Sequence, residues 1–298
     1  MTTATTAVSP ADFDPAIARR KLAGTLFYGA CLAAIGVLLL TLLILLADIL
    51  SRGLPWLDAQ FLTGTPSRRP ERAGVLPALV GSLEIGAIVA LLTFPIGVAA
   101  AIYFTEYAPD NRLNRLLQTN ISNLAGVPSI IYGILGLAVF VQLLHLGRTV
   151  IAASLTLTLL ILPIVIIASI EALKAVPNAQ REGAYALGAT RWQMVSRSVF
   201  PAAAPSIMTG IILAMARAIG EAAPLLMIGG VGFVTFLPSP FDGAYTVLPL
   251  QIFDWAKRPQ DDFASISAAA IIVILVLMFV LNGLALVIRA RLSRHIQW

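Results

Sequence analysis

Six long stretches of the chain are apolar and almost free of charge, and charged side chains gather between them. The stretches cover about residues 22–48, 80–105, 121–145, 149–171, 203–230 and 263–289. A helix rises about 1.5 Å per residue, so about 20 apolar residues are enough to cross a hydrocarbon core about 30 Å thick. The pattern therefore predicts an all-α membrane protein with six transmembrane helices.

The composition of the 298 residues agrees with this interpretation, because 58% are hydrophobic and only 12% are charged. A soluble domain of this size has to cover its surface with polar side chains, so the surplus of apolar side chains must face lipid. The net charge of +5 comes from short basic clusters between the apolar stretches, which favours membrane topology over a nucleic-acid-binding face. With one cysteine, Cys31, neither a disulfide framework nor a metal site is expected.

The distribution of Lys and Arg predicts the orientation, because cytoplasmic loops near span ends collect positive charge. The two termini and the connectors between spans two and three and spans four and five together carry 12 of these residues, whereas the remaining connectors carry 7. We therefore expect both termini to be cytoplasmic. Residues 1–21 would form a partly disordered cytoplasmic tail, and residues 22–298 the transmembrane domain.

Two connectors on the predicted outer side, residues 49–81 and 231–262, are long and rich in Pro, Gly and aromatic residues. We expect short helices at the membrane interface in both. Their aromatic side chains either form a docking surface for a protein outside the membrane or only anchor the chain at the interface, where Trp and Tyr are common.

The cytoplasmic connector between spans four and five carries signals for two helices joined by a turn. Pro177 stops the helix of the fourth span, and Asn178 can cap a short helix that ends near Gly188. Thr190 and Gln193 then form a capping-box pattern at the start of a second helix. The pattern predicts a helix–turn–helix that lies across the cytoplasmic face.

The connector as a whole covers residues 172–201. Its predicted second helix has an apolar stripe. Trp192, Val195 and Val199 recur at three and four residues and share one face. The stripe either docks a partner protein or packs on the spans of its own chain.

A motif inside the connector identifies a family. Glu182, Gly183 and Ala184 are followed by Gly188 and Pro201 at the spacing of the EAA loop of ABC importer permeases, which this segment resembles. Three positions depart from the family pattern: Gly183, Ser198 and Phe200. The resemblance implies the MetI-like fold of a type I importer permease. It also implies that these five motif residues belong to a coupling loop whose helix fits a groove on an ATPase subunit.

Three further segments are similar to phosphate-specific permeases: residues 93–107, 127–133 and 214–226. The last one, which contains Gly-Glu-Ala-Ala-Pro, most resembles the PstA-type subunit. This implies a multi-pass inner-membrane permease that forms half of a path for inorganic phosphate and is not itself an enzyme. The implied partners are a PstC-type permease, a PstB-type ATPase dimer and a PstS-type binding protein outside the membrane.

The sequence contains no G-x-x-x-x-G-K-[ST] loop for binding a nucleotide. We therefore expect no cofactor in this chain, with ATP and Mg held by the partner ATPase. Proline and glycine occur inside several spans, for example at Pro128 and Pro224, and predict the kinks that alternating access can use.

Two charges interrupt the fifth span. Arg217 and Glu221 are four residues apart, so they share a helix face and can pair. Charges at membrane depth are costly and are candidates for function. Arginine can bind phosphate oxygens bidentately, and a carboxylate can accept the phosphate hydroxyl proton, which sulfate lacks. The pair either lines the substrate path or braces the helix, and Glu84 in the second span is a weaker path candidate.

Other functions stay open at this point. Within the same class, the chain is alternatively a permease for molybdate or sulfate, or the PstC-type sister subunit. From other classes, it is an ion-coupled secondary transporter or a membrane enzyme, although an enzyme would be expected to gather His, Asp or Glu near one interface.

Overall fold

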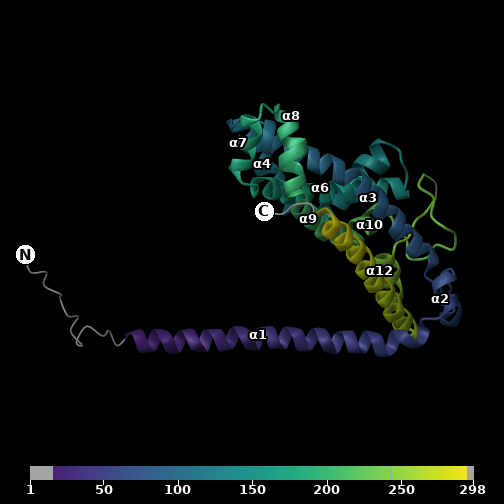
Figure 1. Ribbon diagram of the computed structural model, residues 1–298. Coiled ribbons are helices and arrows are strands. Elements are labelled where there is room, and N and C mark those ends of the chain that lie inside the picture. Colours follow the sequence, from purple (N-terminus) through teal and green to yellow (C-terminus); the bar gives the residue numbers. More distant parts are fainter. Residues whose placement is uncertain (1–15, 242, 294–298) are drawn as a thin grey trace, which may run out of the picture. The chain divides into compact units, whose positions relative to one another are not determined.

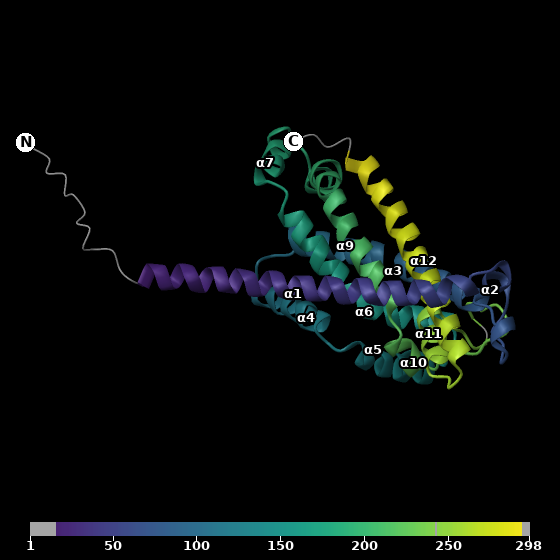
Figure 2. The ribbon, with the colours of Figure 1, turned by 90° about the horizontal axis from the view of Figure 1, so that it is seen from below.

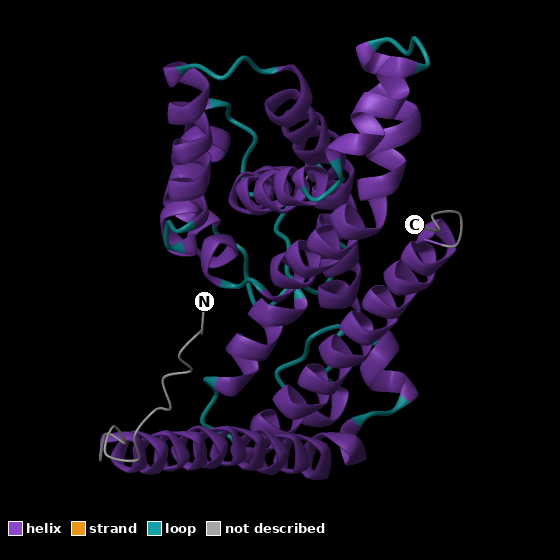
Figure 3. Cartoon of the chain, turned by 60° about the vertical axis from the view of Figure 1, so that its left-hand side comes forward, coloured by secondary structure: helices purple, strands orange, loops and turns teal. Residues whose placement is uncertain are grey.

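The computed structural model describes residues 16–241 and 243–293. Within these ranges the regular elements are helices, and no strand occurs (Figure 3). Five helices are long and apolar enough to cross a membrane, and a sharply bent helix pair makes a sixth if it is taken as one span. The predicted tail, residues 1–21, lies mostly outside the described residues.

The chain divides into two compact units, residues 1–51 and 52–298. The described part of the first unit belongs to one helix, α1 (Ala16–Gly53). From residue 19 to residue 48 each side chain of α1 is exposed, and most of them are apolar. At about 1.5 Å per residue its 38 residues span roughly 57 Å, which exceeds the thickness of a hydrocarbon core.

The second unit is built around helix α6 (Val150–Lys174). Two-thirds of its most apolar stretch is buried, whereas 11% is buried in α12 (Asp261–Ser293). Helices α3 (Leu76–Ile102) and α9 (Phe200–Gly220) both pack on α6 (Figure 1). A Cβ on Gly97 of α3 would lie 2.7 Å from Val165, and one on Gly210 of α9 would lie 2.5 Å from Ala168. Small residues let the backbones approach closely, as is common between membrane helices.

The third predicted span is not one continuous helix. The chain instead forms α4 (Arg112–Ala125) and then α5 (Ser129–Gly136), which continues as a π-helical turn to Leu143. The two segments are bent by 101° at the break. Pro128 explains the break, because it has no N–H to donate and it forces the preceding residue out of helical conformation.

The fifth predicted span is also interrupted. Its helix α9 ends at Gly220, and Glu221 has extended backbone with ψ 125°. A short helix, α10 (Ala223–Ile228), follows the break. A helical break is thus located at the position of the two charges, where the sequence predicted a span running on to residue 230.

The predicted second helix of the 172–201 connector does not lie on the surface as a separate element. Helix α8 (Arg191–Met194) runs through a π-helical turn, Val195–Val199, directly into α9. Val195 and Val199 are buried against the ends of α3 and α6, which explains why this segment joins the bundle. The prediction of a helix–turn–helix across the face is therefore corrected: only α7 (Asn178–Ala186) is separate.

Short helices form in both long connectors, as predicted. They are the 3-10 turns Leu54–Trp56 and Pro70–Arg72, α2 (Ala59–Thr63) and α11 (Leu248–Ala256). Phe61 and Trp255 are fully buried here, with ring centroids 6.0 Å apart, and they pack with Phe263 in a core of their own. These aromatic residues therefore pack the two connectors against each other and against the start of α12. Within the second unit, α2 lies at the end opposite to α7 and α8 (Figure 1).

Candidate functional site: an exposed turn and a pair of intramembrane charges

The segment that resembles the EAA loop is the exposed helix α7 and the turn after it. Gly188 has φ +78°, a left-handed conformation that glycine adopts without strain, and it ends the helix as predicted. The Ala189 N–H donates to the Ala184 carbonyl at 3.1 Å across this turn. The predicted cap by Asn178 is wrong, because Pro177 occupies the N-cap position and Asn178 is the first helical residue.

The predicted capping box at the start of α8 is confirmed. The Gln193 N–H donates to Thr190 Oγ1 at 3.3 Å, and the Thr190 N–H donates to Gln193 Oε1 at 2.9 Å. These reciprocal bonds satisfy two backbone donors that a helix start leaves without partners. The turn between α7 and α8 is therefore fixed at both sides, by Gly188 and by the box.

Helix α7 presents its motif residues to the surroundings. Glu182 and Gly183 are exposed, a Cβ on Gly183 would meet open space, and Leu187 beyond the helix is 90% exposed. Ala184 is half-buried, and Pro201 lies apart from the turn, in the first turn of α9. The face is therefore open to a partner around residues 182–188.

The three residues of the apolar stripe divide between the two predicted roles, packing on the chain itself and contact with a partner. Val195 and Val199 pack on the protein's own helices, whereas Trp192 is 65% exposed. Trp192 lines an apolar hollow together with residues of α3 and α9, such as Pro95 and Phe200. Only one of the three stripe residues is thus left for an external contact.

The two charges in the fifth span are paired, as predicted. Arg217 Nε lies 3.3 Å from Glu221 Oε1, and the Arg217 side chain is 46% exposed and that of Glu221 18%. Since Glu221 follows the last residue of α9 and has extended backbone, the pair closes over the end of the helix and does not lie along a continuous face. The break therefore places a carboxylate and a guanidinium where a helix stops.

Glu84 lies on α3 and is half-buried. Its Oε2 atom is buried and has no hydrogen-bond partner among the described residues. Among the described residues, Arg217 pairs with Glu221 and not with Glu84. The structure thus joins two of the three path candidates and leaves Glu84 separate from their pair.

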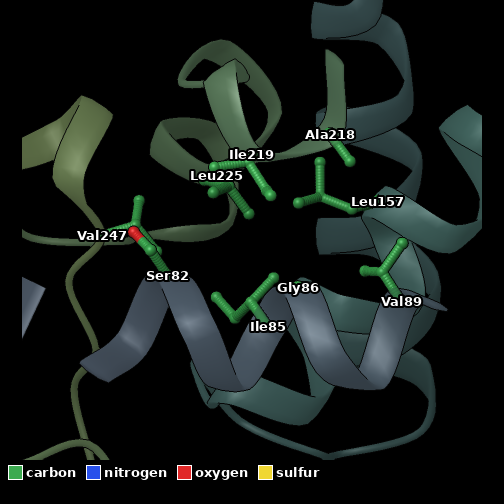
Figure 4. A pocket seen from close by; sticks show the side chains of 9 residues that line it. All are labelled: Ser82, Ile85, Gly86, Val89, Leu157, Ala218, Ile219, Leu225 and Val247. Atoms are coloured by element: carbon green, nitrogen blue, oxygen red, sulfur yellow. The ribbon is translucent and has the colours of Figure 1, made fainter. Parts of the chain in front are cut away.

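A small cavity lies beside the end of α9 (Figure 4). Its lining comes from α3, α6, α9, α10 and the segment before α11: Ser82, Ile85, Gly86, Val89, Leu157, Ala218, Ile219, Leu225 and Val247. It offers about 10 Å³ to the centre of a water molecule, which is room for about one water. The hydroxyl of Ser82, its polar side chain, accepts the Leu248 N–H at 2.8 Å. The cavity is a packing gap and does not fit an oxyanion.

A larger apolar groove of about 300 Å³ runs between α3, α9 and α12. Ser82 and Asn282 are the polar residues of its lining, and Met208, Met215 and Met278 contribute flexible side chains.

Within the described residues, no group of three His, Cys, Asp or Glu side chains is placed to hold a metal ion.

Sequence reasoning missed a pair at the α7 end of the bundle. Glu106, in the π-helical turn Tyr103–Tyr107 that continues α3, binds Arg181 of α7 at 2.8 Å. The two residues are 75 positions apart, so no local spacing indicates the contact. The one available signal was a carboxylate at the end of an apolar span, which Glu106 supplies.

Comparison with known proteins identifies the family to which this arrangement belongs. Residues 93–294 match the family described as binding-protein-dependent transport system inner membrane component. The chain belongs to this permease family. The permease is 34% identical over 277 residues to the phosphate transport system permease protein PstA 1 of Mycobacterium tuberculosis, and the match covers 90% of both proteins. It is 40% identical over 198 residues to the probable ABC transporter permease protein YqgH of Bacillus subtilis, and it spans 63% of the length of that relative.

The fold of the permease agrees with its family. A chain of a bacterial ABC transporter involved in the import of the polysaccharide alginate superposes with a TM-score of 0.66 at 17% identity, covering 92% of the permease and 98% of that chain. The predicted MetI-like importer permease fold is therefore confirmed. Family membership favours an ABC permease over the membrane enzyme and the lone secondary transporter.

Proposed function

We propose that this permease forms half of the membrane path of an ATP-driven importer of inorganic phosphate. The observation that carries the proposal is the Arg217–Glu221 pair at the end of α9. A guanidinium can bind two phosphate oxygens, and a carboxylate beside it can accept a hydrogen bond from the hydroxyl group that phosphate keeps at neutral pH. The relative named as a phosphate transport permease supports the same substrate.

Uptake of this anion has to be driven. Moving one negative charge into a cell with an inside-negative potential costs about 2.3 kcal/mol per 100 mV before any concentration gradient is counted. The sequence has no phosphate-binding nucleotide loop, so a separate ATPase dimer of the PstB type supplies the energy and holds ATP and Mg. The permease itself carries no cofactor.

Helix α7 and the turn after it, at Gly188, make the contact with that ATPase. Glu182, Gly183 and Gly188 are the exposed motif residues of this segment, Ala184 is half-buried beside them, and Pro201 belongs to the same motif. Closure of the ATPase subunits pushes on α7 and switches the spans from inward-facing to outward-facing, and hydrolysis resets them. This places α7 and both termini on the cytoplasmic side of the inner membrane.

Two further partners complete the transporter. A second permease, of the PstC type, supplies the other half of the path. A PstS-type binding protein delivers phosphate to the connectors at the α2 end, which then face outward. Residues 1–21 form the cytoplasmic tail, and residues 22–298 the transmembrane permease domain.

The test is uptake of radiolabelled phosphate by proteoliposomes that contain the assembled transporter. Arg217→Gln should lower uptake at least about tenfold, because a charge-assisted contact with the anion is lost. The matched control is Arg115→Gln, because Arg115 forms an exposed pair with Asp110 at the same 3.3 Å, at the start of α4.

Near-normal uptake by an assembled Arg217→Gln transporter would show that the pair only braces the helix. Normal transport of molybdate or sulfate with no transport of phosphate would support the alternative oxyanion instead.

A further inference from the structure

Arg181 and Glu106 form the most buried ion pair among the described residues. The side chain of Arg181 is 16% exposed and that of Glu106 only 5%. Arg181 Nη2 donates to Glu106 Oε1 at 2.8 Å, and Arg181 Nε donates to the same oxygen at 3.2 Å. The carboxylate thus receives two donors of one guanidinium, a geometry that fixes direction as well as distance.

The same guanidinium also holds the end of α6. Arg181 Nη2 donates to the Leu173 carbonyl at 3.0 Å, and Arg181 Nη1 donates to the Val176 carbonyl at 2.7 Å. The last carbonyls of a helix have no partner within it, and a cation there also meets the negative end of the helix dipole. One side chain of α7 therefore binds both the end of α6 and the extension of α3.

Helix α7 has little else to hold it. None of its residues is fully buried, and Ala184 is the α7 residue that packs on the apolar cluster at this end. A helix of nine residues is marginal without tertiary contacts. Besides packing on α8 and the turn Val195–Val199, α7 is thus held to the extension of α3 by the contact between Arg181 and Glu106.

We propose that the Glu106–Arg181 ion pair is the link through which movement of α7 is passed to α3. This rests on the proposed function, in which an ATPase pushes on α7. Breaking the pair would strand a buried charge, so the two elements move together, whereas an apolar contact can slide. Helix α3 lines the 300 Å³ groove with α9 and α12, and Pro95 inside it gives a point at which it can bend. Glu106 and Arg181 are positioning residues that do not touch the substrate.

The first experiment measures phosphate imported per ATP hydrolysed by the assembled transporter in proteoliposomes. Glu106→Gln, which keeps the shape of the side chain, should lower this ratio at least about fivefold, and Arg181→Lys should lower it too, because one ammonium cannot replace the fork of donors. The matched control is Lys174→Gln, since Lys174 forms an exposed pair with Glu171 at 3.2 Å on a neighbouring turn. Its ratio should stay unchanged.

A merely structural role would lower the amount of assembled transporter, or ATPase activity and uptake in proportion, and leave the ratio unchanged. An unchanged ratio in both Glu106→Gln and Arg181→Lys therefore overturns the proposal. If Glu106→Gln does not assemble, Glu106→Asp, which keeps the charge on a shorter stem, takes its place with the same criterion.

The second experiment does not depend on the substrate. The background is Cys31→Ser, which removes the one cysteine of the permease. Spin labels are attached to Tyr103→Cys and Ala186→Cys, at two exposed positions. With an intact pair the label distance should be the same in the nucleotide-free and the vanadate-trapped transporter. In Glu106→Gln it should differ between the two states. An equal distance in both states of the variant overturns the link.

The two experiments separate this proposal from the proposed function. If the unsubstituted transporter imports no phosphate, the proposed function fails, while the label distances still test the link. If phosphate is imported and the label distances do not respond to Glu106→Gln, the link fails and the function stands.

Discussion

Gly133 of α5 lies directly against Pro224 of α10: a Cβ on Gly133 would be 2.7 Å from the Pro224 Cα. The two helices that follow the breaks in the third and fifth spans are therefore packed backbone to backbone (Figure 2). A Cβ on Gly136, three residues further along α5, would come still closer to the Thr156 side chain of α6. The glycines of α5 thus let two interrupted spans meet beside the central helix.

Gly133→Ala should therefore destabilise the permease. Its methyl group would meet backbone atoms that cannot rotate away, at a cost of about 1–3 kcal/mol in the free energy of unfolding. Thermal unfolding of the transporter in detergent measures this. Gly283→Ala in α12 is the control, because a Cβ there meets nothing within 4 Å, and it should not lower the midpoint, since alanine favours a helix over glycine. Equal midpoints for both variants would contradict the close contact.

Glu221→Gln should weaken discrimination between phosphate and sulfate about tenfold, because a neutral amide also offers donors to an unprotonated oxyanion. The measurement is inhibition of labelled phosphate uptake by unlabelled sulfate. Glu171→Gln is the control, since Glu171 forms an exposed pair with Lys174 at the end of α6, and it should leave the selectivity unchanged. Unchanged selectivity in Glu221→Gln would argue against a hydrogen bond from the phosphate hydroxyl to the Glu221 carboxylate.

Gly188→Val should uncouple ATP hydrolysis from uptake. A β-branched residue at φ +78° costs about 1–2 kcal/mol or more, although the surrounding space is open. The strain would distort the turn after α7 while the spans stay intact. Gly188→Asn is the control, because asparagine tolerates the left-handed region, and it should keep most of the coupling. The readout is the ratio of ATP hydrolysis to uptake, and a normal ratio in Gly188→Val would contradict the role of the turn.

Tyr245→Phe should lower stability by about 1 kcal/mol. The buried Tyr245 hydroxyl donates to the Leu225 carbonyl at 3.1 Å, and that carbonyl also accepts the Gly230 N–H at 2.9 Å, so it keeps one partner in the variant. Burial also raises the pKa of the Tyr245 phenol above its ordinary value, so this tyrosine should ionise last in an alkaline absorbance titration. Loss of an early-ionising tyrosine in Tyr245→Phe would contradict its buried position.

Local signals in the sequence predicted much of this structure. The apolar stretches predicted the long helices, Gly188 predicted the end of α7, and the Thr190 and Gln193 pair predicted a capping box. Each of these features depends on residues within one or two turns. The pairing of Arg217 with Glu221 was predictable for the same reason.

The features that the sequence did not predict depend on tertiary contacts. Glu106 and Arg181 meet only because the extension of α3 and the first turn of α7 come together in the fold. Whether Val199 would face a partner or its own chain was decided by the space between α3 and α6. The break at Glu221 lies in an apolar stretch, where composition alone favours an unbroken span.

That break has a consequence for water. Backbone groups released from a helix cannot stay unsatisfied in hydrocarbon, and irregular backbone at membrane depth occurs where protein or water supplies the missing hydrogen bonds. At the start of α10 the N–H groups of Ala223 and Leu225 have no preceding turn of helix to bond to, next to the half-exposed Arg217. If this segment spans the membrane as proposed, either protein groups or water supply those hydrogen bonds. Where water does so, an anion that reaches Arg217 keeps part of its hydration shell during the crossing.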